Sequence, residues 1–93
     1  MINYRIYETG EFLSILARLD AKSKRFVETK LATYLYPQLR ERPHHGTNIR
    51  KLQGYRPATW RYRLGRFRLF YTIDENEHIV TILTFDDRKD AYR

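Results

Sequence analysis

Arginines alternate with aromatic and aliphatic residues on both sides of a single glycine, Gly65. The alternation over residues 60–71 predicts two β-strands joined by a tight turn, because side chains point alternately to the two faces of a strand. With Gly65-Arg66 as a two-residue type II′ turn, one face carries the apolar side chains and the other carries Arg61, Arg63 and Arg68. Arg63 then lies directly opposite Arg68, although like charges on paired strands are destabilising. This arrangement predicts a surface that binds a polyanion.

Guanidinium groups suit a phosphate ligand, since their planar fork of N–H donors matches phosphate oxygens and their charge is permanent. They can therefore stabilise negative charge that develops on phosphorus during a reaction. An arginine is a poor general base, because it is not deprotonated in proteins. Any reaction at this face must take its proton-transfer groups from other residues.

The positive charge of the chain is concentrated around this hairpin. The 93 residues include 18 Lys and Arg against 11 Asp and Glu, which gives a net charge of +7. Residues 40–71 contain nine basic side chains and one acidic one, so the remainder is nearly neutral. Such a local excess favours nucleic acid, an acidic protein or an anionic membrane surface as the partner, whereas a merely solvated exterior mixes both signs.

Composition excludes several other classes of protein. There is no cysteine, which rules out disulfides and thiolate chemistry. No apolar run reaches the length of a signal peptide or a membrane span, so we expect a cytoplasmic protein without a membrane partner. His44, His45 and His78 lack the spacing of metal ligands, and we expect neither metal nor cofactor.

The flanking segments predict the core that supports the hairpin. Residues 4–7 form a first strand, and Thr9 caps a helix with apolar residues at helical spacing. Asp20 caps a second helix, which ends before Pro37 or extends to Arg40 and has an apolar stripe of Phe26, Val27, Leu31, Tyr34 and Leu35. After a long loop at 37–58 come the hairpin, a polar turn at 74–77 and a last strand at 79–85.

This order, β-α-α-β-β-β, predicts an α+β fold: a small, mainly antiparallel sheet with two N-terminal helices packed on one face. If the turn after residue 73 has four residues, Leu83 lies beside Arg68. The chain then leaves the sheet near Gly65, and residues 86–93 emerge next to the arginines. One extra loop residue would change this register.

Three motifs in this order resemble the RelE/ParE superfamily of bacterial and archaeal toxins: Lys51-Leu52-Gln53-Gly54, the hairpin at 60–71, and Arg88-Lys89-Asp90-Ala91-Tyr92-Arg93. The resemblance covers almost the whole chain and implies a single RelE-like toxin domain, residues 1–93, from a type II toxin–antitoxin pair. RelE-like members cut mRNA in the ribosomal A site, whereas ParE-like members inhibit DNA gyrase. Members of both branches are neutralised by an antitoxin whose segment wraps the toxin.

Matched residue by residue, the RelE-like catalytic positions fall on Arg61, Arg63, Arg68, Arg88 and Tyr92. Tyr92 is expected to stack on or position the RNA. Where many relatives have Gly-His, this chain has Asp86-Asp87, so the role of that histidine is filled by Asp87 or is unfilled. Proton transfer must come from Asp87, Asp86, Tyr92 or the ribosome itself. The candidate RNA contacts outside the catalytic set are Arg50, Lys51 and Arg66. The basic residues before the hairpin contact phosphates or antitoxin carboxylates.

The resemblance implies a ribosome-dependent mRNA endoribonuclease that needs no metal and inhibits translation, with the 2′-hydroxyl attacking the adjacent phosphate. Two alternatives stay open: a ParE-like gyrase inhibitor, and a catalytically impaired relative that still binds RNA or antitoxin. The Asp86-Asp87 pair motivates the second, since it adds negative charge beside a phosphate site. The expected partners are mRNA in the ribosomal A site and a cognate antitoxin, whose acidic, amphipathic segment would fold onto the basic surface beside Phe70.

Overall fold

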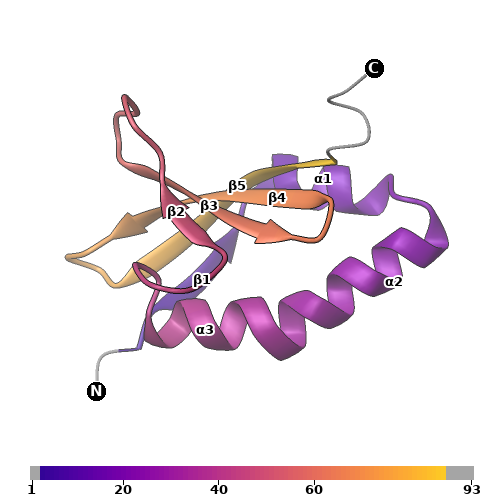
Figure 1. Ribbon diagram of the computed structural model, residues 1–93, viewed down its shortest axis with the longest axis horizontal. Coiled ribbons are helices and arrows are strands. Elements are labelled where there is room, and N and C mark those ends of the chain that lie inside the picture. The colour runs from indigo at the N-terminus through magenta and orange to yellow at the C-terminus, as the bar shows by residue number, and fades with distance from the viewer. Residues whose placement is uncertain (1–2, 88–93) are drawn as a thin grey trace.

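The structure is a computed structural model that describes residues 3–87, in which a twisted five-stranded sheet packs against helices (Figure 1). The elements in chain order are β1 (Arg5–Glu8), α1 (Gly10–Ala17), α2 (Ala21–Lys30), a π-helical segment η1 (Leu31–Leu35), α3 (Tyr36–Glu41), β2 (Ile49–Lys51), β3 (Thr59–Leu64), β4 (Phe67–Asp74) and β5 (Ile79–Asp87). None of the helices formed within residues 3–87 has the length and apolar character needed to cross a bilayer.

The sheet is mixed, with strand order β1-β5-β4-β3-β2. Strands β2 to β5 form an antiparallel meander, and β1 pairs with β5 in parallel at one edge. The α+β class predicted from the sequence is confirmed. The predicted order is incomplete, because it omits β2, a three-residue strand within what reads as loop, and it does not include the parallel edge.

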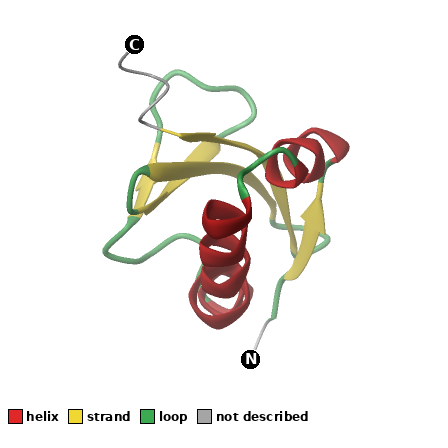
Figure 2. Cartoon of the chain, turned by 90° about the vertical axis from the view of Figure 1, so that its right-hand side faces the viewer, coloured by secondary structure: helices red, strands yellow, loops and turns green. Residues whose placement is uncertain are grey.

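One core fills the space between the sheet and the helices. In Figure 1, α2 and α3 lie below the sheet and α1 lies beside the end of β4 and β5, and Figure 2 shows the sheet above a helix that is seen end-on. Phe12 and Leu16 of α1 meet residues of the α2–α3 helix and the buried side chains of β3, β4 and β5. Tyr71, which is fully buried, donates its hydroxyl hydrogen bond to the Pro43 carbonyl at 2.7 Å, so burial of the ring leaves no polar group unpaired. Burying one such large side chain contributes about 1.5–3 kcal/mol.

Both predicted helix caps are present. The Thr9 and Asp20 side chains accept hydrogen bonds from the backbone N–H groups of Phe12 and Ser23 at 3.1 Å each. The second helix continues past Pro37 and ends at Glu41. This end lies one residue beyond Arg40, the later of the two predicted ends. A proline inside a helix removes a backbone donor and crowds the preceding turn. The wider π-helical turn just before Pro37, in which Tyr36 N–H reaches the Leu31 carbonyl, accommodates it.

The β3–β4 hairpin has the predicted register, with Arg63 opposite Arg68 and Leu64 opposite Phe67. Gly65 has a φ of +59°, whereas φ of Arg66 is negative, as a type II′ turn requires. Only glycine adopts the positive value without strain. The hairpin could be placed from the sequence because this turn fixes its register.

The predicted pairing of the last strand is wrong for two reasons. The four-residue turn lies at 75–78, with Asp74 opposite Ile79, which shifts the pairing by two residues, and a β-bulge in β5 shifts it by one more. Phe70 pairs with Thr84 and Tyr71 with Ile82, so Leu83 is the extra residue and Asp86, not Leu83, lies beside Arg68. The Thr9 hydroxyl donates a 2.7 Å hydrogen bond to the Leu83 carbonyl and thereby ties the bulge to the start of α1. Strand β5 also continues to Asp87, opposite Phe67, so the chain does leave the sheet beside the Gly65 turn.

Candidate nucleic-acid interface

Four arginines from three neighbouring strands share the sheet face opposite the core. Arg50 of β2 pairs with Arg61 of β3, and Arg63 of β3 pairs with Arg68 of β4. Their strand neighbours Tyr62, Leu64, Phe67 and Leu69 are buried in the core, so alternation turns the arginines to the other side. We call this surface the arginine face. It brings together three of the predicted catalytic residues and one of the predicted RNA contacts.

The arginine face carries more positive charge than its protein neighbours neutralise. Burial, together with the charges of Arg63, Arg50 and Arg68, lowers the pKa of Arg61, although a guanidinium group remains protonated in this setting. The Nε atoms of Arg61 and Arg68 are buried and lack a hydrogen-bond acceptor among the described residues. A buried donor without an acceptor destabilises the folded protein. An anionic ligand that accepts hydrogen bonds from these guanidinium groups would remove that cost. These unpaired donors and the concentrated positive charge are features that suit an anionic ligand.

The two consecutive aspartates at the end of β5 point to opposite sides of the sheet. Asp86 lies on the arginine face, with Oδ2 3.6 Å from an Nη atom of Arg68, and its side chain is half exposed. Asp87 lies on the other side, where Oδ1 is 3.1 Å from Nε of Arg66. The bulge at Leu83 decides this assignment, since it shifts the alternation by one residue. The carboxylate nearest the arginine face is that of Asp86, whereas the sequence resemblance pointed to Asp87.

Two other predicted RNA contacts lie away from the arginine face. Lys51 pairs with Trp60 on the opposite side of the sheet, with Nζ 5.8 Å from the centre of the Trp60 ring. Arg66 donates from an Nη atom to the Ser23 hydroxyl at 3.1 Å and stacks over the Phe67 ring at 5.0 Å. Arg88 and Tyr92 lie outside the described residues. The geometry therefore unites Arg50, Arg61, Arg63 and Arg68 but not Lys51 or Arg66.

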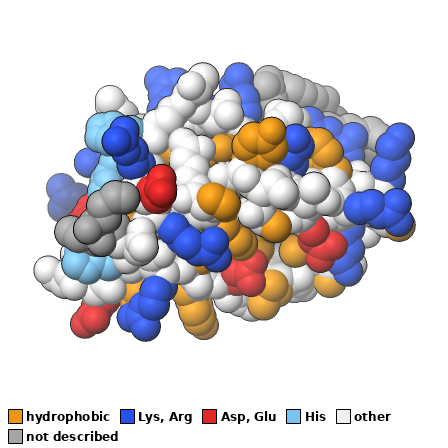
Figure 3. All heavy atoms as spheres, turned by 90° about the horizontal axis from the view of Figure 1, so that it is seen from below, with side chains coloured by type: hydrophobic (Ala, Val, Ile, Leu, Met, Phe, Trp, Pro, Cys, Tyr) orange, Lys and Arg blue, Asp and Glu red, His pale blue; other side chains and the backbone are white. Residues whose placement is uncertain are grey.

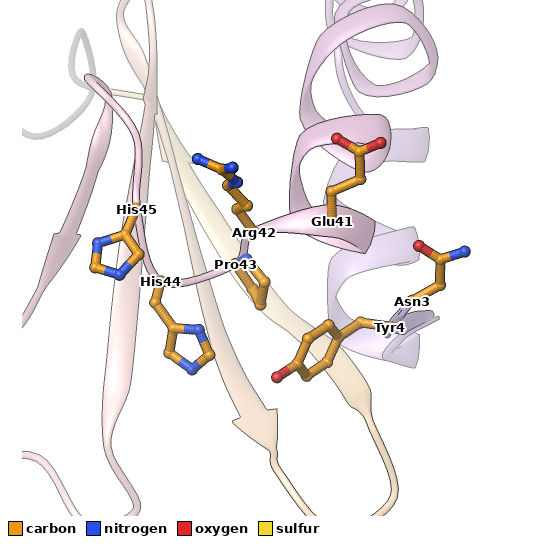
Figure 4. Close-up of a pocket in the computed structure, with 7 residues that line it drawn as sticks. All are labelled: Asn3, Tyr4, Glu41, Arg42, Pro43, His44 and His45. Atoms are coloured by element: carbon orange, nitrogen blue, oxygen red, sulfur yellow. The ribbon is translucent and has the colours of Figure 1, made fainter. Parts of the chain in front are cut away.

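A second polar cluster occupies the far end of the molecule. Glu75 accepts hydrogen bonds from the Tyr4 hydroxyl at 2.8 Å and from Nε2 of His44 at 2.6 Å, beside a hollow lined by residues 3–4 and 41–45 (Figure 4). These two bonds lower the pKa of Glu75. The His44 ring packs edge-on against Trp60, at 5.4 Å between ring centres. Within residues 3–87, no three His, Asp or Glu side chains are grouped to hold a metal ion. The cluster joins three distant segments of the chain.

Two residues of the predicted apolar stripe of the second helix are exposed instead of buried. Phe26 and Tyr34 retain 42% and 60% of their accessible surface, and Nζ of Lys30 lies 4.5 Å from the centre of the Tyr34 ring. From the helix side, hydrophobic side chains are exposed between basic ones (Figure 3). The spacing of Phe26, Lys30 and Tyr34, four residues apart, indicates that they share an outer face. A mixed apolar and basic surface of this kind suits a protein partner.

The comparisons with known proteins agree with this architecture. A family model described as ParE toxin of type II toxin-antitoxin system, parDE, matches residues 6–92. No curated protein is significantly similar to the sequence. The toxin–antitoxin complex RelBE2 from Mycobacterium tuberculosis contains a chain with 26% identity and a TM-score of 0.72, covering 95% of this chain and 94% of that one.

Other solved structures share the fold at lower identity. The archaeal RelE–RelB complex from Pyrococcus horikoshii matches with 22% identity and a TM-score of 0.66, over 94% of this chain and 97% of that chain. A mutant of the Escherichia coli toxin RelE in the free state matches with 18% identity and a TM-score of 0.67, over 98% and 90%. These two matches establish the fold alone.

Proposed function

The chain belongs to the family of ParE toxins of type II toxin–antitoxin systems, within the RelE/ParE superfamily, and from this premise we propose that it cleaves mRNA on the ribosome and so inhibits translation. The observation that carries this proposal is the arginine face. Arg63 stands opposite Arg68 with Arg61 and Arg50 alongside, and the buried Nε donors of Arg61 and Arg68 have no hydrogen-bond partner within residues 3–87. A toxin that only inhibits by contact has no need of such a surface.

The proposed reaction uses the nucleophile that RNA already contains. The 2′-oxygen attacks the adjacent phosphorus, an O2′–P bond forms, and the P–O5′ bond breaks. A base takes the 2′-hydroxyl proton and an acid returns a proton to the 5′-oxygen. Arg61, Arg63 and Arg68 hold the phosphate and stabilise the charge of the phosphorane, while Arg88 and Tyr92 complete the site by resemblance. No step requires a metal ion.

Asp86 is the carboxylate that the fold offers for proton transfer. It lies beside Arg68 on the arginine face, whereas Asp87 is paired with Arg66 on the other side. A carboxylate next to the bound phosphate can accept the 2′-hydroxyl proton, which an arginine cannot. We therefore move the proposed proton-transfer role from Asp87 to Asp86.

The proposed dependence on the ribosome is implied by the family resemblance, and the flat shape of the surface supports it. Side chains on a sheet face bind any phosphate backbone but hold no single phosphate in line with its 2′-oxygen. A ribosome that presents the codon in a bent conformation supplies that alignment, which accounts for a large part of the rate. Purified protein should therefore cut free RNA far more slowly than ribosome-bound message.

An antitoxin is the proposed protein partner. Several structurally similar chains were solved as complexes with RelB antitoxins, among them those from Mycobacterium tuberculosis and Pyrococcus horikoshii. An acidic segment that covers the arginine face would compete with RNA for the same guanidinium groups. The exposed Phe26 and Tyr34 on the helix side offer apolar contacts to such a partner.

Inhibition of DNA gyrase is the second candidate, because the matching family model carries the ParE description. Addition of purified protein to a translating extract and to a gyrase supercoiling reaction separates the two. The nuclease proposal expects truncated message with ends in the A site and unchanged supercoiling, and Arg68→Ala should slow the truncation about 10²–10³-fold. Intact message with blocked supercoiling would favour the gyrase inhibitor. If the purified protein neither truncates message nor blocks supercoiling, the chain is a toxin relative without catalytic function.

A further inference from the structure

One aromatic residue, Phe70, borders the arginines on the arginine face. Phe70 pairs with Arg61 on one side and with Thr84 on the other, and its same-face neighbours along β4 are Arg68 and Thr72. Every neighbour in the sheet lattice is thus polar or charged. Phe70 belongs neither to the buried core nor to the partly buried hydrophobic residues that pack against the core.

The usual structural explanations do not account for this ring. Single partly exposed phenylalanines are common on protein surfaces. A cation stacked on the Phe70 ring would explain why a phenylalanine occupies this position. The cation–π contacts of the described residues involve Phe26, Tyr34, Tyr36, Trp60 and Phe67, and none involves Phe70. Among the described residues, no guanidinium or ammonium group is therefore stacked on the Phe70 ring.

The β-bulge lies next to this ring. The extra residue, Leu83, falls between the partners of Phe70 and Tyr71. Bulges increase the local twist of a strand and redirect the side chains beside them. As a result Thr84, with its small side chain, faces the same side as Phe70, while Phe85 turns into the core. The neighbour of Phe70 on β5 is therefore a small side chain and not a second large apolar one.

We propose that Phe70 is a stacking platform for an unpaired nucleobase whose phosphate is held by Arg61 and Arg68. This inference rests on the proposed nuclease function and adds a binding subsite for one nucleotide, separate from the stacking that the resemblance assigns to Tyr92. Neighbouring strands lie about 4.8 Å apart, so the ring and the guanidinium groups are within reach of a single nucleotide. A base paired in a duplex cannot stack here, and the face consequently selects single-stranded RNA.

The test measures whether binding depends on the base and on the ring together. A short fluorescein-labelled 2′-O-methyl oligonucleotide, which cannot be cleaved, is compared with the same backbone lacking bases and with its duplex, by fluorescence anisotropy at low salt. The wild-type protein should bind the base-bearing strand about 5- to 150-fold more tightly than the abasic strand. Phe70→Leu should remove this preference, and Phe70→Trp should keep it. Tyr34→Leu, which removes an exposed aromatic ring on the helix side, is the matched control and should also keep it.

The outcomes distinguish this inference from the proposed function. Two results would overturn the stacking role: equal binding of abasic and base-bearing strands by the wild type, or an undiminished preference in Phe70→Leu. In either case Phe70 would be assigned to a protein contact. RNA binding that still depends on the arginines would continue to support the nuclease proposal. Binding of none of the oligonucleotides would overturn both proposals. The salt dependence should be the same for wild type and Phe70→Leu, because no phosphate contact is lost.

Discussion

Replacement of Asp86 by asparagine should separate RNA binding from RNA cleavage. The carboxylate lies 3.6 Å from the Arg68 guanidinium and adds negative charge where a phosphate would bind. Unit charges about 4 Å apart interact by about 1 kcal/mol in water, and by several times more at a lower effective dielectric. Because both side chains are partly exposed, the smaller figure applies. Asp86→Asn should therefore tighten RNA binding by about 1 kcal/mol, or about fivefold.

Cleavage by the same variant should change in the opposite direction. If Asp86 accepts the 2′-hydroxyl proton, its loss removes a general base, which typically contributes about 10²–10⁴ in rate. Binding is measured by anisotropy with a non-cleavable oligonucleotide, and cleavage by the rate at which message ends appear in a translating extract. An enzyme that binds more tightly and cuts more slowly is an outcome that simple loss of folding cannot produce.

Asp87→Asn is a closely matched control, since it removes the same charge at the next position. Asp87 lies on the opposite side of the sheet and pairs with Arg66, so both RNA affinity and cleavage should change less. Weaker RNA binding by Asp86→Asn would refute the idea that this carboxylate competes with phosphate. Undiminished cleavage would show that Asp86 is not the base, and a larger loss in Asp87→Asn would return that role to the neighbouring residue.

Three other predictions concern the charge, the bulge and the Glu75 cluster. Arg68→Ala should lower cleavage about 10²–10³-fold and reduce the salt slope of RNA binding by about one, while Arg68→Lys restores the salt slope but not the rate. Thr9→Val should cost about 1–2 kcal/mol in urea unfolding, because the helix cap and the bond to the Leu83 carbonyl are both lost, and Thr9→Ser should be nearly neutral. Hydrogen bonds from His44 and Tyr4 lower the pKa of Glu75 below its ordinary 4.5, so their stabilisation is present above that pH and is lost as the carboxyl protonates at lower pH. Glu75→Gln should flatten the dependence of unfolding free energy on pH as the pH falls below the ordinary pKa of 4.5, which urea unfolding at a series of pH values measures.

The central hairpin could be predicted from the sequence because its information is local. Gly65 fixes the turn, the turn fixes the register, and strict alternation then assigns Arg63 and Arg68 to one face. The caps at Thr9 and Asp20 are local in the same sense, since each side chain bonds a backbone group three residues away.

The pairing of the last strand depends on distant contacts and could not be predicted in the same way. The bulge at Leu83 is fixed by the Thr9 hydroxyl, 74 residues earlier in the chain. The sequence contains one sign of the bulge in the spacing of the buried apolar residues of β5. Val80 and Ile82 are two residues apart, as in a regular strand, whereas Ile82 and Phe85 are three residues apart. The extra residue decides which aspartate accompanies Arg68. Strand β2 could not be predicted because its three residues are too few to show a period-two pattern. The parallel edge of the sheet could not be predicted because no local sequence rule pairs β1 with β5.

The position of β1 in the sheet has a consequence for synthesis of the protein. β1 emerges before every other element, yet its only strand partner among the described residues is β5, which is made after all the rest. Helices and the meander can form while the chain grows, since their contacts are close in sequence. The edge strand has to wait, because its partner does not yet exist. The sheet of this chain is therefore complete only after β5 has been made, and a nascent chain interrupted before residue 79 lacks the strand that brings Asp86 to Arg68.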